Sequence, residues 1–355
     1  MLHHLLHVVG ARPNFMKAAP VFRALAGPGF RQELVHTGQH YDANMSEVFF
    51  HQLEIPPPNV NLEVGSGSHA LQTAAIMTGL ESVVTQRKPE LVIVYGDVNS
   101  TIAAALVCSK LLVPVAHVEA GLRSGDRTMP EEINRLVTDQ LSQFLFTPSR
   151  DGDENLAREG IPGDRIHLVG NVMIDTLVHL LPRALELDLN GFPAHYALVT
   201  LHRPSNVDDP GKLRLILNAM IEIGRDVPVV FPVHPRTRQR IAQFGLSADG
   251  LLLCDPMPYL EFLALQSRAQ VVVTDSGGIQ EETTFLGVPC LTMRNNTERP
   301  VTIEVGTNVL VGDDMEKFRA EFTKVLHGRP KQAAIPPLWD GHASERIAHV
   351  LKDQL

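Results

Sequence analysis

A twofold series of short apolar runs, each followed by a segment of helical pattern, constrains the fold of this 355-residue chain more than any other feature. The runs are bounded by turn-forming residues and are rich in β-branched side chains, which is typical of buried strands. Strands that alternate with helices form βαβ units and parallel sheets. We therefore predict an α/β fold with strands at residues 5–9, 33–36, 91–95, 114–118, 143–146 and 165–169, and a second series at 197–201, 228–231, 251–253, 270–274, 289–292 and 308–310.

The length of the chain also favours two domains, because a single hydrophobic core rarely grows beyond about 250–300 residues. The first strand series stops near residue 170, and a stretch punctuated by Pro, Gly and Asn leads into the second series. We predict an N-terminal domain over residues 1–170 and a C-terminal domain over residues 171–339. A last amphipathic segment, within residues 340–355, is expected to form a helix that joins the first domain.

The composition excludes several classes of function. A net charge of −9 argues against a general surface for nucleic acid or anionic membranes, because such partners need a concentrated positive field. The apolar stretch at residues 91–118 is interrupted by charged and amide side chains, so it predicts no membrane span. The three cysteines are scattered through apolar runs and the first residues lack a signal-peptide pattern, which predicts buried thiols and a cytoplasmic location.

The most informative segment is an apolar strand that runs into small residues and then a helical pattern, at residues 271–282. Gly277 and Gly278 allow close approach to the backbone, and the N–H groups at a helix start attract phosphate. The hydroxyl of Ser276 adds a donor, and Glu282, one turn further on, can accept hydrogen bonds from ribose hydroxyls. The alternative is a tight turn whose acidic residues only complement the helix dipole.

A second segment that points to an anion follows the first strand. Arg12 and Lys17 flank the start of the next predicted helix, where Pro13 suits the first position. The segment matches neither GxGxxG nor GxxxxGK[ST], so it predicts neither a dinucleotide fingerprint nor an ATPase P-loop. The two cations are either surface residues or ligands of an anion. A helix N-terminus disfavours positive charge, which favours the bound anion.

Acidic residues follow two successive strands of the first domain. Asp97 comes after residues 91–95 and Glu119 after residues 114–118, so the two carboxylates are expected to lie near each other. Such a pair is suited to general acid and base catalysis, because a neighbouring carboxylate can raise one of the two pKa values. Glu131 at a predicted helix start is a third candidate. Alternatively, Asp97 caps a helix and Glu131 complements a helix dipole.

Basic residues are predicted at the strand ends of the second domain. His202 and Arg203 follow its first strand, and His234 follows the next. Arg299 lies in the Thr-Glu-Arg-Pro segment at residues 297–300. Among the sixteen histidines, His202 is the best candidate for chemistry. No cluster has zinc-ligand spacing and no Gly-x-Ser-x-Gly elbow is present, so we predict neither a metal site nor a serine hydrolase.

These segments together resemble the family of non-hydrolysing UDP-N-acetylglucosamine 2-epimerases over nearly the whole chain. The match rests on GARP with Lys17 (10–17), TGQH (37–40), GD (96–97), HVEAGLR (117–123), PEEINR (130–135), HR (202–203), DSGGIQEE (275–282) and TERP (297–300). The resemblance implies the GT-B architecture, in which two Rossmann-like doubly wound domains face each other across a cleft. It also implies catalytic carboxylates in the first domain and UDP binding by the second.

Roles follow from the resemblance residue by residue. In such enzymes the C2 proton is removed, UDP leaves C1 to give a 2-acetamidoglucal, and UDP adds back after C2 is reprotonated on the opposite face. The predicted catalytic residues are Asp97, Glu119, Glu131 and His202. The predicted substrate-binding residues are Arg12, Lys17, Gln39, His40, Arg203, His234, Ser276, Gly277, Gly278, Glu282 and Arg299.

The resemblance gives specific roles to some of these residues. Ser276, Gly277, Gly278 and Arg299 are expected to hold the diphosphate region, Glu282 the ribose, and Arg12 and Lys17 the phosphate or leaving group. Gln39 and His40 match the neighbourhood of a regulatory UDP-sugar site in some members. A homodimer and a reaction without a cofactor are expected.

The sequence departs from the commonest family pattern at two places. Asn14 stands where many members have glutamate, and the stretch at residues 125–130 is short. A related UDP-sugar, such as a diacetamido uronic acid, is therefore an alternative substrate. The competing functions are a hydrolysing 2-epimerase, a GT-B glycosyltransferase and a sugar-nucleotide sensor without turnover.

Overall fold

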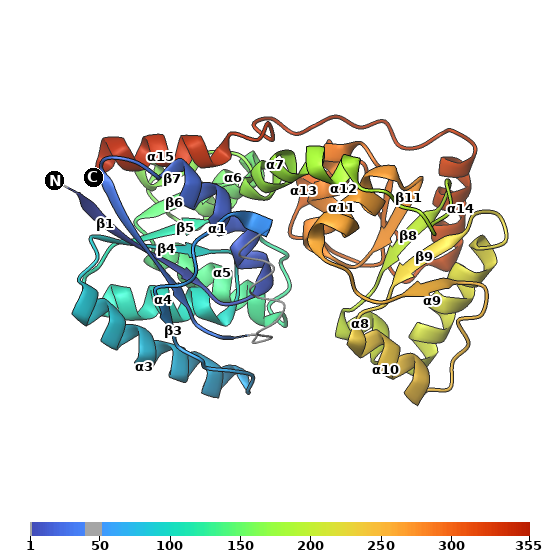
Figure 1. Ribbon diagram of the computed structural model, residues 1–355, viewed down its shortest axis with the longest axis horizontal. Coiled ribbons are helices and arrows are strands. Elements are labelled where there is room, and N and C mark those ends of the chain that lie inside the picture. Colours follow the sequence, from blue (N-terminus) through green and yellow to red (C-terminus); the bar gives the residue numbers. More distant parts are fainter. Residues whose placement is uncertain (1, 40–51) are drawn as a thin grey trace. The chain divides into compact units, whose positions relative to one another are not determined.

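The computed structural model describes residues 2–39 and 52–355. The chain divides into two compact units (Figure 1): unit 1 comprises Met1–Thr176 and Pro337–Leu355, and unit 2 comprises Leu177–Pro336. The boundary falls inside helix α7 (Val172–Glu186), so one continuous helix leaves unit 1 and enters unit 2. Among the described residues, no helix is both long and apolar enough to cross a membrane.

Unit 1 is built on a seven-stranded sheet whose strand pairs are all parallel, in the order β3-β2-β1-β4-β5-β6-β7. Its strands are β1 (His3–Val9), β2 (Phe30–His36), β3 (Val60–Asn61), β4 (Leu91–Tyr95), β5 (Val115–Val118), β6 (Phe144–Thr147) and β7 (Ile166–Leu168). The sequence did not predict β3. A strand of two residues carries no alternation of buried and exposed positions, and only its pairing with β2 makes it a strand.

Helices cover both faces of this sheet. They are α1 (Arg12–Ala24), α3 (His69–Arg87), α4 (Asn99–Lys110), α5 (Pro130–Leu141), α6 (Arg150–Arg158) and α15 (Ala343–Gln354), with a 3-10 turn at Gly163–Arg165. Val92 and Val94 of β4 pack with α3 and α4, whereas His7 of β1 contacts Phe22 of α1. Helix α15 packs against α1 within unit 1. The carboxylate of Asp175 in α7 accepts the N–H of Ala343 at 3.1 Å and that of Ser344 at 2.7 Å, which caps α15.

Unit 2 has a six-stranded parallel sheet in the order β10-β9-β8-β11-β12-β13. Its strands are β8 (Ala197–Thr200), β9 (Val229–Pro232), β10 (Leu252–Cys254), β11 (Val271–Thr274), β12 (Cys290–Thr292) and β13 (Asn308–Leu310). Its helices are α8 (Pro204–Val207), α9 (Pro210–Ile223), α10 (Pro235–Gln243), α11 (Tyr259–Arg268), α12 (Gly277–Leu286), α13 (Pro300–Glu304) and α14 (Met315–Leu326).

The core of unit 2 explains why its strands read as continuous apolar runs. Val271 and Val273 belong to one cluster with residues of α9 and α14, and Val272 between them belongs to a second cluster with Leu265 of α11. Because both faces are covered, neither can be polar. The prediction of two parallel α/β sheets is confirmed. In such sheets ligands bind beyond the carboxyl ends of the strands, which is where the residues of interest lie in each unit.

Candidate functional site

In unit 1, two predicted acids follow neighbouring strands. Asp97 lies just beyond β4 and Glu119 just beyond β5, and these strands pair in parallel with Tyr95 opposite Val118. The N–H of Gly96 donates to the carbonyl of Val118 at 3.0 Å, which holds the two strand ends together. The sheet therefore brings the backbones of both acids to one edge.

Glu119 is buried and forms an ion pair with Lys17 of α1, which is buried as well. A Cβ at Gly96 would lie 2.7 Å from Nζ of Lys17 and 3.1 Å from Oε2 of Glu119. The φ of Gly96 is +63°, which also favours glycine. Glycine at this strand end therefore leaves room for the ion pair. Lys17, which the sequence assigns to a phosphate, contacts a candidate catalytic acid in this structure.

Asp97 pairs with a different cation. Its side chain is 26% exposed and contacts Arg135, whose side chain is 2% exposed. Arg135 also donates from Nη2 to Glu132 at 2.7 Å, and Glu132 accepts the N–H groups of Ser124 and Gly125. Burial alone would raise the pKa of Glu132, but these hydrogen bonds and the guanidinium lower it. Asp97 is thus held by a buried arginine that is itself anchored by a second carboxylate.

Glu131 and Glu132 in the first turn of α5 have opposite environments. Glu131, the predicted catalytic residue, is exposed, whereas Glu132 is buried against Arg135. The sequence analysis did not assign a role to Glu132 or Arg135. Their spacing of three residues on a helix was a signal that could have found the pair, because such residues share one face.

A buried histidine and aspartate lie beneath the two strand ends of unit 1. Nδ1 of His117 is 2.6 Å from Oδ1 of Asp139, and its Nε2 is 2.8 Å from the carbonyl oxygen of Gly96. Asp139 also accepts the N–H of Gly121 and contacts Arg123. His117 and Asp139 are both 0% exposed, so they are inaccessible to a substrate. We infer that they position the backbone next to Asp97 and Glu119.

Asn14 is buried and uses both ends of its amide. Its Oδ1 accepts the N–H groups of Gly10 and Ala11 at 3.0 Å each, and its Nδ2 donates to the carbonyl of Tyr95 at 2.8 Å. An ionised glutamate accepts hydrogen bonds but cannot donate one to a carbonyl. The asparagine at this position therefore ties the start of α1 to the end of β4.

Gln39 is buried in a polar cluster of unit 1. Its Oε1 accepts the hydroxyl of Ser100 at 2.8 Å, and its carbonyl accepts a hydrogen bond from Gln72 at 3.3 Å. These contacts are to residues of unit 1. His40 and the side chain of Arg12, which the sequence also predicts to bind substrate, lie outside the described residues.

In unit 2, His202 lies beyond β8 and Asp275 beyond β11, two strands that pair in parallel. Nδ1 of His202 is 3.0 Å from Oδ1 of Asp275, and the N–H groups of His202 and Arg203 donate to Oδ2 at 3.0 and 2.9 Å. Burial alone would raise the pKa of Asp275, but its hydrogen bonds, first that from His202, lower it. The His202 side chain remains 44% exposed, so its ring is accessible to a ligand.

Ser276 and Gly277 begin α12, where the anion cradle was predicted. Ser276 is the N-cap and Gly277 the first helical residue. A Cβ at Gly277 would overlap Nη1 of Arg299 and lie 2.7 Å from Oε1 of Glu298. Among the described residues, nothing lies within 4 Å of a Cβ built at Gly278. The backbone is therefore open to a ligand at Gly278, while at Gly277 a protein side chain makes the close approach.

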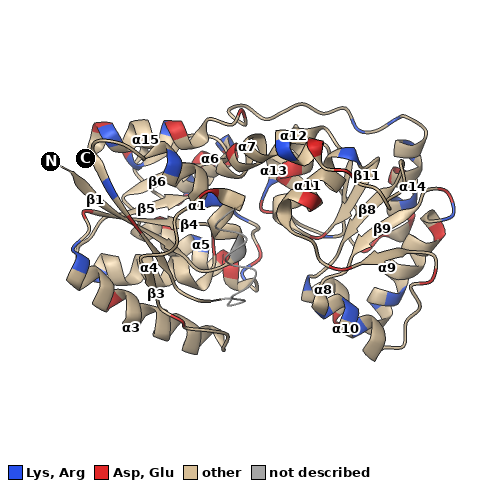
Figure 2. Ribbon diagram, in the orientation of Figure 1, with Lys and Arg blue, Asp and Glu red and all other residues tan. Residues whose placement is uncertain are grey.

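Glu298 gathers arginines beside this helix start. It is 2.7 Å from Arg294 Nη2, 2.5 Å from Arg299 Nη1 and 3.8 Å from Arg203 Nη2. Burial would raise the pKa of Glu298, but these guanidinium groups hold it far below its usual range. Figure 2 shows acidic and basic residues close together around α12 and α13. The sequence analysis did not single out Glu298 or Arg294, because one acid between two cations is also a common surface pattern.

Glu282 of α12 is buried and accepts a hydrogen bond from the hydroxyl of Tyr259 at 2.9 Å. Burial raises the pKa of Glu282 to about 7, against the opposing effect of Tyr259. The predicted ribose ligand is therefore a carboxyl group that changes protonation near neutral pH.

His234, the last predicted residue of unit 2, is the N-cap of α10 and accepts the N–H of Arg236 at 3.2 Å. Burial and the neighbouring His202 and Arg236 lower the pKa of His234. Its ring centroid lies 5.9 Å from that of His202. The structure therefore brings His202, Arg203 and His234 together at the ends of β8 and β9.

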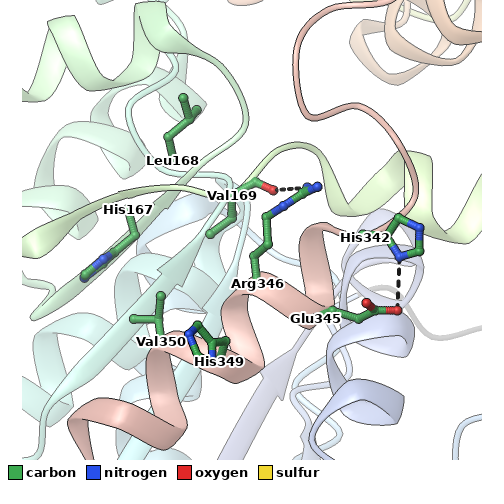
Figure 3. Close-up of a pocket in the computed structure, with 8 residues that line it drawn as sticks. All are labelled: His167, Leu168, Val169, His342, Glu345, Arg346, His349 and Val350. Atoms are coloured by element: carbon green, nitrogen blue, oxygen red, sulfur yellow. Dashed lines mark hydrogen bonds and ion pairs between the residues drawn. The ribbon is translucent and has the colours of Figure 1, made fainter.

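Figure 3 shows a pocket of about 760 Å³ elsewhere in unit 1, and its lining includes none of the predicted site residues. It is lined by His167, Leu168, Val169, His342, Glu345, Arg346, His349 and Val350. The Arg346 side chain donates to the carbonyl of Val169 at 3.0 Å, and His342 pairs with Glu345 at 3.1 Å. These polar groups hold α15 to the end of β7, so this pocket is not the candidate site.

The fold and the strand-end residues define an α/β enzyme with two Rossmann-like units of the GT-B class. A family model described as UDP-N-acetylglucosamine 2-epimerase matches residues 23–352. The chain belongs to this family and is therefore an epimerase, a class of isomerase.

Two relatives match the chain over almost its whole length. One is the UDP-N-acetylglucosamine 2-epimerase of Methanocaldococcus jannaschii, which is 43% identical over 97% of each chain. The other is the UDP-2,3-diacetamido-2,3-dideoxy-D-glucuronate 2-epimerase of Pseudomonas aeruginosa, which is 44% identical over 98% of this chain and 99% of the relative.

A solved structure shares the fold. The crystal structure of the M. jannaschii enzyme in complex with UDP-GlcNAc and UDP has a TM-score of 0.91 at 42% identity and covers 99% of each chain. The prediction of a GT-B architecture and of the epimerase family is confirmed. The roles of individual residues stay predictions.

Proposed function

We propose that the protein interconverts UDP-N-acetylglucosamine and UDP-N-acetylmannosamine without net hydrolysis. The observation that carries the proposal is the pair of acids at neighbouring strand ends of unit 1, each next to a buried cation: Glu119 with Lys17, and Asp97 with Arg135. Carboxylates with fixed cationic partners are suited to taking a proton and returning one. Two related enzymes that act on UDP-sugars match the chain end to end, which supports the same class of substrate.

In this mechanism one carboxylate removes the proton at C2, and the C1–O bond to UDP breaks to give 2-acetamidoglucal. A second acid then protonates C2 on the opposite face, and UDP adds back to C1. We propose Asp97, Glu119 and Glu131 as the proton-transfer groups, with His202 as a further catalytic residue. No net oxidation occurs, so the reaction requires no redox cofactor.

Binding of UDP is the proposed role of unit 2. The open backbone at Gly278 and the N-terminus of α12 are suited to phosphate oxygens, because helix N–H groups and the helix dipole attract anions. We propose that Ser276, Gly277 and Arg299 contribute to the same site and that Glu282 binds the ribose hydroxyls. Arg203 and His234 would border it.

The remaining predicted residues are proposed as follows. Arg12 and Lys17 would stabilise the departing phosphate, and Gln39 and His40 would belong to a regulatory region. A homodimer in the cytoplasm remains the expected assembly and location.

A second candidate substrate is UDP-2,3-diacetamido-2,3-dideoxy-D-glucuronate. The relative named for that reaction is 44% identical to this chain, about as similar as the UDP-N-acetylglucosamine 2-epimerase at 43%. Both reactions invert C2 of a UDP-linked 2-acetamido sugar, so the same acids would serve either. Only groups on the sugar ring, at C3 and C6, differ.

The test is proton NMR of the protein with each UDP-sugar in deuterated water. The proposal predicts a new manno anomeric signal from UDP-N-acetylglucosamine, deuterium at C2 and little free UDP. Exchange only with the diacetamido uronate would replace the first substrate with the second. Stoichiometric release of UDP would favour a hydrolysing enzyme, turnover only with an added acceptor would favour a glycosyltransferase, and binding without exchange to either sugar would favour a sensor.

A further inference from the structure

The carboxylate of Asp275 is the most heavily hydrogen-bonded acid at the strand ends of unit 2, and the mechanism above gives it no task. It is 0% exposed and lies one residue before Ser276, the N-cap of α12. A carboxylate in that environment cannot contact a substrate. Its effect on any reaction must pass through the groups that it holds.

The two oxygens of Asp275 hold different partners. Oδ2 accepts from the N–H of His202 at 3.0 Å, from the N–H of Arg203 at 2.9 Å and from Nδ2 of Asn206 at 3.1 Å. Oδ1 is 3.0 Å from Nδ1 of the His202 ring and 3.2 Å from its backbone nitrogen. One oxygen therefore anchors the loop after β8, and the other faces the imidazole.

We propose that Asp275 is the positioning residue for His202: it fixes the proton of a neutral imidazole on Nδ1 and presents Nε2 to the sugar nucleotide. A carboxylate oxygen can only accept, so the ring nitrogen that faces it must donate. The 44% exposure of the His202 side chain leaves the other side of the ring accessible. The same aspartate joins the histidine loop to the start of α12, so the two move together.

This inference rests on the proposed function in one respect, that His202 contributes to catalysis. A purely structural role for Asp275 is the competing explanation, because three of its contacts anchor backbone or the Asn206 amide. The tautomer of His202 separates the two explanations, since a structural anchor does not depend on which ring nitrogen carries the proton.

The variant Asp275→Asn makes the separation sharp. The three N–H donors that surround Oδ2 require an oxygen there, so the new amide nitrogen would face Nδ1 of His202. An amide N–H forces that ring nitrogen to accept, which moves the imidazole proton to Nε2. Size and hydrogen-bond geometry are otherwise kept, so the change tests the donor and acceptor pattern.

The experiment is a long-range ¹H–¹⁵N correlation spectrum of ¹⁵N-labelled protein at about pH 9, where imidazoles are neutral. His202→Gln identifies the His202 signals among the sixteen histidines. We expect the Nδ1–H tautomer in the wild type and the Nε2–H tautomer in Asp275→Asn. The rate of C2 exchange should fall by about 10²–10⁴, the usual contribution of an acid–base group, at nearly unchanged affinity for UDP.

Asn206→Ala is the matched control, because it removes one donor to Oδ2 and leaves the ring contact in place. It should lower thermal stability and keep the Nδ1–H tautomer. An Nε2–H tautomer in the wild type would overturn the proposal even if Asp275→Asn fails to fold. A changed tautomer with wild-type exchange would overturn it too. Absence of turnover by the wild type would count against the proposed function instead, because the tautomer is read without substrate.

Discussion

Units 1 and 2 both gather buried charges at the carboxyl ends of their central strands, but the charges have different partners. In unit 1 the buried cations pair with predicted catalytic acids, Lys17 with Glu119 and Arg135 with Asp97. In unit 2 the arginines converge on Glu298, for which no chemical step is proposed. The difference indicates that unit 1 fixes carboxylates in place, whereas unit 2 fixes guanidinium groups beside the start of a helix.

The histidines of the two units show the same division. His117 in unit 1 and His202 in unit 2 each have Nδ1 next to a buried aspartate. Nε2 of His117 contacts the carbonyl of Gly96, and this ring is fully buried. The His202 side chain is 44% exposed. One motif therefore serves to hold a backbone in unit 1 and to present a ring in unit 2.

The largest expected effect tests whether unit 1 performs the proton transfer. In Asp97→Asn the amide oxygen can still accept from Arg135, but the side chain can no longer take a proton. We expect C2 exchange to fall by about 10²–10⁴, which is the usual contribution of a general base. The affinity for UDP should stay as in the wild type. Deuterium incorporation measured by NMR and titration calorimetry with UDP check the two halves.

Asp164→Asn is the matched control for Asp97→Asn, because Asp164 is an exposed acid of the same unit. It should leave exchange and UDP binding unchanged. Wild-type exchange in Asp97→Asn would remove Asp97 from the catalytic residues. A loss of UDP affinity in that variant would erase the contrast between the two units.

The second effect sharpens the contrast for a carboxyl group of unit 2. Glu282 contacts the Tyr259 hydroxyl, and burial raises the pKa of Glu282 from 4.5 to about 7. Between these values the folded state binds more protons than the unfolded state, so the free energy of unfolding falls as pH rises from 4.5 to 7. The total loss is on the order of 3 kcal/mol, from 1.36 kcal/mol per pKa unit.

Glu282→Gln should remove this pH dependence, since a neutral amide does not titrate. Urea denaturation between pH 4.5 and 8 should show similar stability for both proteins at the acid end and a more stable variant at the alkaline end. Glu316→Gln, at an exposed position of α14, should keep the wild-type pH dependence. Parallel curves for the wild type and Glu282→Gln would mean that Glu282 is ionised throughout, as its counterparts in unit 1 are by their ion pairs.

The strands could be predicted from the sequence because the physics that forms them is local. A strand covered on both faces must be apolar throughout, and residues 271–274 show this directly. Once strands are placed, the residues after them lie at the ligand-binding edge, which identified Asp97, Glu119, His202 and Ser276. The edge strand β3 was missed because two residues carry no pattern.

The partners of the site residues depend on tertiary contacts that spacing does not encode. Lys17 and Glu119 are separated by 102 positions and meet only because α1 packs across the end of β4 and β5. The sequence analysis therefore assigned Lys17 to phosphate alone. Glu131 and Glu132 are neighbours in the same helical turn, and only the packing of α5 decides which one is buried. Local pattern gives the place of a side chain along the chain, whereas packing gives its partner.

The smallest expected effect refines the description of the helix start in unit 2. A Cβ at Gly277 would overlap Arg299 and press on Glu298, and both side chains are buried and bonded to each other. Gly277→Ala should therefore cost about 1–3 kcal/mol of stability, as overpacked sites do. Gly278→Ala meets nothing within 4 Å in the described part of the chain, and alanine is the better helix former, so it should fold at least as stably.

The two alanine variants have opposite expected readouts, and thermal denaturation with calorimetric titration of UDP measures both. Gly278→Ala should bind UDP more weakly at unchanged stability, because the new methyl group occupies the approach to the backbone N–H groups of α12. Wild-type affinity in Gly278→Ala would show that the anion does not approach this helix start. Wild-type stability in Gly277→Ala would show that Arg299 can move aside, and the arginines of unit 2 would then be less rigidly held than the ion pairs of unit 1.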